Sequence, residues 1–184
     1  MEERRFFTNN VANLAMTYGT VMGLFWILKF LLIPFIFTVP FASLLFVILT
    51  LSVPFVGYFM ARQYRNRYCP DGVVSFIQAW VFTLLLYVYA ALLVAVVHYL
   101  FFQYFNDGTL VATYNSLLDE MVKASPELAS TVAEYHKAMD QVTSLSPIEL
   151  TLQLLLNNIF YGMMFALPTA FLLAFRRKKA DYVN

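Results

Sequence analysis

Five polar side chains could do chemistry within an otherwise apolar chain: Lys29, His98, Glu149, Gln153 and Asn157. Lys29 lies inside a long apolar stretch, and an ionisable group within a membrane helix is costly to bury and commonly marks a functional site. Gln153 and Asn157 are one helical turn apart, which places both on the same face of a helix. We expect the five side chains to lie near one level of the protein, and one hypothesis is that they bind a lipid headgroup or a small solute.

Two other interpretations stay open for these residues. Lys29 lies close to the end of its predicted helix, so its long stem could carry the ammonium group to the membrane surface. Asn157 and its neighbour Asn158 could instead hydrogen-bond between helices and hold the bundle together. Neither of these interpretations involves a ligand.

Other kinds of chemistry find little support. The single cysteine, Cys69, excludes an intramolecular disulfide, and His98 and His136 are too far apart in sequence to suggest a metal site. No zinc-protease, phosphate-loop or serine-hydrolase motif is present. The net charge of +1 gives no field that would attract nucleic acid. We therefore expect no enzyme activity, no cofactor, no metal and no nucleic-acid partner.

The composition indicates the class of protein to which these residues belong. The chain has 184 residues, of which 61% are hydrophobic and 12% are charged. A soluble domain has about 45–50% apolar and about 25% charged residues, so the sequence predicts an integral membrane protein. Long stretches without charge predict four spanning helices within one membrane domain, at 11–33, 41–61, 73–100 and 150–175. The first stretch is too long for a cleaved signal peptide, and we expect it to be retained as a span.

The segment 106–146 is the long polar stretch between the third and fourth spans. Apolar residues recur at helical spacing in each half, and Ser125-Pro126 separates the halves as a capping serine followed by a proline at the first helical position. Ser146 and Glu149 form a capping box that starts the fourth span. The segment is therefore predicted to be an amphipathic helical hairpin, folded on itself or resting on the membrane or a partner.

Basic residues predict the orientation in the membrane. The segment 62–72 is expected to be a basic cytoplasmic loop, and four spans place every basic cluster on the same side as both termini. The hairpin then lies on the extracytoplasmic side of the membrane. The residues that set this orientation are Arg62, Arg65, Arg67, Arg176, Arg177, Lys178 and Lys179.

Small residues and prolines shape the spans. Small residues recur every fourth position in the first and fourth spans, which lets another helix approach closely, more plausibly within this chain than in a dimer. Pro54 and Pro168 lie inside the second and fourth spans and are expected to bend them. The packing residues are Ala15, Gly19, Gly23, Gly162, Ala166 and Ala170.

Several segments together resemble a known family. They are Tyr18-Gly19-x-x-x-Gly23, the Tyr/Arg-rich stretch before Gly72, and Ser75-Phe76-x-x-Ala79, followed by the acidic segment and the basic C-terminal run. This pattern is similar to the domain of unknown function family 4199, small four-span proteins of the bacterial inner membrane. The resemblance implies an accessory protein associated with membrane glycosyltransferases, and it supplies no catalytic residue.

The sequence thus predicts an all-α, four-helix transmembrane bundle with an external amphipathic hairpin between spans three and four. The leading functional hypothesis is a non-enzymatic accessory or scaffold protein of the cell envelope that supports a membrane enzyme acting on lipid-linked substrates. Its partners would be membrane lipids and another membrane protein or a second copy of itself. The alternative is a lipid- or solute-binding protein that uses the polar cluster around Lys29.

Overall fold

The computed structural model describes residues 2–69, 72–105 and 108–175, and these residues form helices without any strand. The all-α class predicted from the sequence is confirmed. The α-helices are α1 (Glu2–Phe30), α2 (Pro40–Tyr68), α3 (Phe76–Tyr104), α4 (Thr109–Ala124), α5 (Ala129–Thr143) and α6 (Pro147–Phe175). Two 3₁₀ helices, η1 (Ile33–Phe35) and η3 (Pro126–Leu128), lie between them.

Four segments in the described part of the chain are long and apolar enough to cross a membrane. They are Val11–Phe35, which joins α1 to η1, and the whole of α2, α3 and α6. The last three helices have 29 residues each. At 1.5 Å per residue they are about 43 Å long, whereas the hydrocarbon core is about 30 Å thick. The chain is therefore a multi-pass helical bundle whose helices extend beyond the apolar layer.

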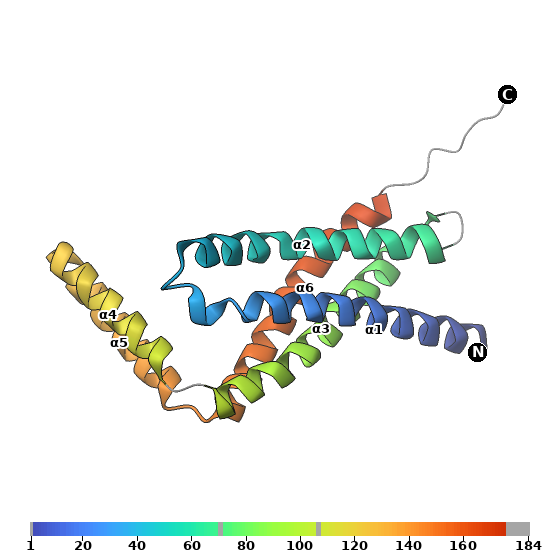
Figure 1. Cartoon of the computed structure of the whole chain (residues 1–184). Helices are drawn as coiled ribbons and strands as arrows, with labels where there is room; N and C mark the ends of the chain where they lie inside the picture. Colours follow the sequence, from blue (N-terminus) through green and yellow to red (C-terminus); the bar gives the residue numbers. More distant parts are fainter. Residues whose placement is uncertain (1, 70–71, 106–107, 176–184) are drawn as a thin grey trace.

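Helix α3 is the centre of the bundle and packs along both α1 and α6. Its side chains Phe82, Leu86 and Tyr87 are fully buried. From α1, the ring of Tyr18 meets Phe82 edge-on and Trp26 stacks on Tyr87, with ring centroids 5.8 and 6.0 Å apart. Figure 1 shows α3 and α6 running together and crossing the direction of α1 and α2.

Glycines allow this close packing around α3. A Cβ atom added to Gly19 would lie 2.8 Å from the carbonyl oxygen of Leu86, and one added to Gly162 would lie 2.5 Å from the Cβ of Tyr87. Both distances are too short, so only glycine fits. The small residues predicted for helix packing are all buried within this one chain, and they are Ala15, Gly19, Gly23, Gly162, Ala166 and Ala170. The sequence analysis missed Gly57 of α2, where a Cβ would overlap the hydroxyl of Tyr87.

Prolines lie inside two of the spanning helices. Each of α2 and α6 continues on both sides of its proline, Pro54 or Pro168. Proline has no N–H, so the carbonyls of Thr50 and Met164 lose their usual partners within the helix. Both prolines line the same apolar groove of about 420 Å³ between α2 and α6.

The basic segment is not the loop that the sequence predicted. Residues 62–68 form the last two turns of α2, which ends at Tyr68. The reason is that arginine and glutamine are good helix formers, so the end of the apolar run marks the membrane boundary and not the end of the helix. Arg176, Arg177, Lys178 and Lys179 lie outside the described residues.

The two ends of the bundle differ in what they connect. At one end, the basic end, α2 ends and α3 begins; at the other, the hairpin end, α3 ends and α6 begins (Figure 1). Helices α4 and α5 extend away from the hairpin end as an antiparallel pair. They bury Leu118 and Val132.

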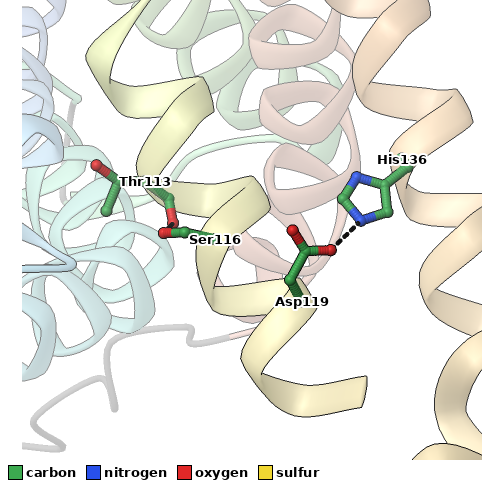
Figure 2. Close-up of polar contacts among 4 residues, drawn as sticks. All are labelled: Thr113, Ser116, Asp119 and His136. Carbon is green, nitrogen blue, oxygen red and sulfur yellow. Dashed lines mark hydrogen bonds and ion pairs between the residues drawn. The ribbon is translucent and has the colours of Figure 1, made fainter. Parts of the chain in front are cut away.

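Polar contacts tie the hairpin together. In Figure 2 the carboxylate of Asp119 on α4 points toward the imidazole of His136 on α5, and Nε2 lies 3.3 Å from Oδ1. Ser116 donates a hydrogen bond to the carbonyl oxygen of Thr113 within α4. Ser125 was predicted to cap the second helix, but its side chain makes no cap bond, because η3 intervenes and α5 begins only at Ala129.

Candidate functional site

Four of the five polar residues predicted to form one cluster are divided between two cavities at the hairpin end. Lys29 and His98 line a small cavity, which we call the Lys29 cavity. Gln153 and Asn157 line a larger cleft at the base of the hairpin, which we call the hairpin cleft. Leu154 of α6 lines both, so this side chain lies between the two spaces. The single cluster expected from the sequence is therefore two neighbouring sites.

All four spanning segments contribute to the Lys29 cavity. It has a volume of about 150 Å³. Its polar lining residues are Trp26 and Lys29 of α1, His98 of α3 and Asn158 of α6. Phe30, Ile33, Phe46, Val94 and Leu154 supply the apolar remainder. The result is a polar patch bordered by apolar side chains, within the membrane-spanning part of the bundle.

Lys29 lies on the face of α1 that packs against the rest of the bundle. The side chain is half-buried, and its Nζ lies 5.7 Å from the centroid of the Phe46 ring on α2. An ammonium group over an aromatic face is attracted by the negative ring face. Among the described residues the one ion pair found is that between Asp119 and His136 in the hairpin, so no described carboxylate neutralises Lys29.

Two further side chains in this cavity have polar atoms without partners. His98 is 5% exposed and Trp26 is 6% exposed. The Nδ1 atom of His98 and the Nε1 atom of Trp26 are buried and make no hydrogen bond. The imidazole packs against Phe30 with ring centroids 4.4 Å apart. Buried polar groups in proteins are almost always hydrogen-bonded, so two orphaned nitrogens in one small cavity call for an explanation.

The hairpin cleft is the larger of the two spaces. It has a volume of about 800 Å³ and lies where the end of α3, the start of α4 and the end of α5 meet α6. Its polar contribution from α6 is the two amides of Gln153 and Asn157, both exposed. The apolar walls include Phe102, Val111 and Leu150.

Glu149 lines neither cavity. Its Oε2 accepts hydrogen bonds from the backbone N–H and the hydroxyl of Ser146, at 2.8 and 2.6 Å, and its own N–H donates to Ser146 Oγ. The predicted capping box is therefore confirmed. The role of Glu149 is to begin α6, which leaves it outside the polar site proposed from the sequence.

A second polar cluster lies at the basic end, and its members hydrogen-bond one another. The Nε2 of Gln78 donates to Tyr64 Oη at 2.8 Å and to Cys69 Sγ at 3.6 Å. Tyr64 stacks on Phe82 with ring centroids 3.9 Å apart and planes 7° from parallel. Ser75 Oγ accepts from the backbone N–H of Gln78 and so caps α3.

Arg65 belongs to this basic end and is buried, unlike Arg62 and Arg67, which are exposed. Its Nη1 donates to the carbonyl oxygen of Leu173 at 3.2 Å, near the end of α6, where carbonyls lack helical partners. Its Nε and Nη2 both donate to Asn66 Oδ1. Arg65 thus joins α2 to α6, a role beyond the orientation signal expected from the sequence.

Trp26 was not predicted to line a site, and Asn158 was predicted only to pack between helices. Trp26 is three residues before Lys29, a spacing that places both on one face of a helix and could have identified it. No sequence pattern could have identified Asn158, because the rotation of α6 relative to α1 decides whether Asn157 or Asn158 faces Lys29. No group of three or more His, Cys, Asp or Glu side chains suited to a metal ion lies among the described residues.

A family model described as "Protein of unknown function (DUF4199)" matches residues 17–174. A search of curated proteins and a search of solved structures each found no match.

Proposed function

The chain belongs to the DUF4199 family of proteins of unknown function, and from this premise we propose that it is a non-enzymatic accessory protein of the bacterial inner membrane. In this proposal the α4–α5 hairpin docks a partner protein. The termini lie in the cytoplasm and the hairpin on the other side, as the distribution of basic residues favours. The family resemblance makes the expected partner a membrane enzyme that acts on lipid-linked substrates.

The exposed apolar side chains of the hairpin are the observation that carries this proposal. Met121 is 50% exposed and Tyr135 is 52% exposed, and Leu117 and Val142 are exposed as well. The inner faces of α4 and α5 are already used, since Leu118 and Val132 are buried. An amphipathic pair that still presents large apolar side chains on an arm outside the bundle is typical of a surface that another molecule covers.

The charge of the hairpin favours a protein, and not the lipid surface, as the molecule that covers its exposed apolar side chains. Helices α4 and α5, together with η3 between them, contain five acidic residues and two lysines, so the net charge of this segment is −3; they are Asp119, Glu120, Glu127, Glu134 and Asp140, and Lys123 and Lys137. Helices that lie on membranes are usually rich in lysine and arginine, because bilayers carry anionic lipids. We therefore propose a partner with an apolar patch bordered by basic residues.

Purification in mild detergent with quantitative mass spectrometry tests this role. The hairpin variant Met121→Ser with Tyr135→Ser removes two exposed apolar side chains, and we expect it to lose a stoichiometric protein that the wild type retains. The matched control, Ala124→Ser with Ala138→Ser, changes two exposed positions on the same two helices and should retain it. If the hairpin variant and the wild type retain the same proteins, or only a second copy of this chain, the proposal is wrong.

A second function has a separate observation in its favour. The hairpin cleft of about 800 Å³ is large enough for part of a lipid, and its amides Gln153 and Asn157 could hydrogen-bond a headgroup. On this alternative the protein binds a lipid or an apolar solute. Native mass spectrometry of the variant Leu150→Trp, which fills the cleft, distinguishes the two: loss of a bound lipid with retention of the partner protein would favour the alternative at this site.

A further inference from the structure

We propose that the Lys29 cavity is a binding site for one phosphate-class oxyanion. The groups that would hold it are the ammonium of Lys29, the indole N–H of Trp26, the imidazole of His98 and the amide of Asn158. This inference does not depend on the partner-docking role of the hairpin or on the hairpin cleft, because none of these four residues belongs to either.

The chemistry of the lining selects an anion. An ammonium group and an indole N–H are donors only, an amide supplies two N–H donors, and an imidazole nitrogen donates in one tautomer. No acidic residue lines the cavity. A cation would therefore meet repulsion from Lys29 and find few acceptors, whereas an oxyanion accepts from every one of these groups.

Burial makes this a formed site and not a surface patch. Trp26 and His98 are each more than nine-tenths buried, and their unpartnered Nε1 and Nδ1 atoms are in side chains that line the cavity. A bound oxyanion would satisfy both atoms at once. It would also neutralise Lys29, which has no carboxylate partner among the described residues. An unneutralised charge in the apolar layer is unfavourable, so all three features point to the same ligand.

The depth and the volume of the Lys29 cavity restrict which oxyanion could bind. His98 lies six residues before the end of α3, and Asn158 lies eleven residues after the start of α6. At 1.5 Å per residue, the cavity is about 9–16 Å inside the ends of these helices, which themselves extend beyond the hydrocarbon layer. The volume of about 150 Å³ is that of about five water molecules and admits a single tetrahedral oxyanion. The source is either the phosphate of a lipid headgroup or free phosphate.

The fluorescence of the tryptophans in this chain can be used to measure anion binding at the Lys29 cavity directly. The chain has two, and the variant Trp80→Phe leaves Trp26 as the sole tryptophan. Trp80 is a matched reference, because its Nε1 is also buried and unpartnered but does not line the cavity. We would titrate the delipidated, detergent-solubilised Trp80→Phe protein with inorganic phosphate, and separately with phosphatidylglycerol or phosphatidylcholine in mixed micelles.

We expect Trp26 emission to change saturably with one of these additions. A response to inorganic phosphate identifies a free anion as sufficient, and a response to both phospholipids or to phosphatidylglycerol alone identifies a headgroup phosphate. Adding Lys29→Met should weaken the response at least about tenfold, since a hydrogen bond to a charged group is lost. The reciprocal variant Trp26→Phe, which retains Trp80, should show no emission change.

Two results would overturn the site. One is an unchanged Trp26 emission with all three additions in protein that is folded by circular dichroism. The other is an equal response with and without Lys29→Met, since binding would then occur elsewhere. Because Lys29→Met removes a charge from apolar surroundings and is expected to fold, loss of structure does not confuse the outcome.

Discussion

The polar clusters at the two ends of the bundle differ in whether their polar groups have partners. At the basic end, Gln78 has two acceptors, Tyr64 and Cys69, and Arg65 hydrogen-bonds the backbone of α6. At the hairpin end, Lys29 has no described carboxylate partner, and the buried nitrogens of Trp26 and His98 are unpartnered. A fully paired network stabilises a fold, whereas an unpaired one costs stability unless something else completes it. The paired cluster is suited to a structural role, and the unpaired one is where we propose that an anion binds.

The variant Gly19→Ala should have the largest effect, because it breaks the scaffold that the two ends share. The added methyl would press on the Leu86 carbonyl and the Tyr89 Cβ, and neither backbone nor Cβ can move aside easily. We expect a loss of about 3 kcal/mol in the free energy of unfolding, measured by denaturation in mixed micelles with SDS. Thr20→Ala, at an exposed position of the same helix, is the control and should change little.

The variant Arg65→Met tests the paired end. It removes the hydrogen bond to Leu173 and leaves that buried carbonyl without this donor. We expect a loss of about 2 kcal/mol in the same unfolding assay. Exposed Arg67→Met is the matched control, and an equal loss in both variants would show that the Leu173 contact is not what matters.

The variant Lys29→Met tests the unpaired end, where the expected effect has the opposite sign. Without a bound anion, removing an unneutralised ammonium from apolar surroundings should leave the free energy of unfolding unchanged or raise it by up to about 1 kcal/mol. The measurement uses delipidated protein. A loss as large as that of Arg65→Met would erase the difference between the two ends.

The smallest effect concerns the thiol at the basic end. Burial raises the pKa of Cys69 above its ordinary value of 9.0, and Tyr64 and Arg65 partly oppose this shift. A buried acid with a raised pKa favours folding fully below pH 9.0, and this contribution is lost as the pH rises above that value. Maleimide labelling of folded protein should therefore be slower than in SDS, with its pH midpoint displaced upward. Gln78→Leu removes a hydrogen bond donated to Sγ, which destabilises the thiolate, so this variant should react more slowly still.

Much of the fold could be predicted, because the cost of charge in hydrocarbon is strong and local. The gaps between charged residues predicted four spans, and the glycine spacing predicted tight packing. Helix ends were predicted less well. Arg62 to Tyr68 looked like a loop because a charged run ends the apolar layer, yet nothing in it ends a helix before Tyr68.

The division of the polar cluster could not be predicted, and the reason is rotational. Consecutive residues on a helix point about 100° apart, so Asn157 and Asn158 face different spaces. Sequence spacing places Gln153 and Asn157 together, but only the packed bundle shows that Asn158 is the one that faces Lys29. The orphaned nitrogen of Trp26 likewise depends on which neighbours fail to reach it.

The central position of α3 has a consequence for how the protein is made. The ribosome completes α1 and α2 before α3, yet the fully buried Tyr87 of α3 packs against Trp26 of α1, Gly57 of α2 and Gly162 of α6. Because N-terminal segments emerge first, the glycine face of α1 contacts lipid until α3 has been inserted. The bundle is complete only after α6 has followed. A chain truncated before α6 would leave Tyr87 facing lipid and would be a natural substrate for membrane proteolysis.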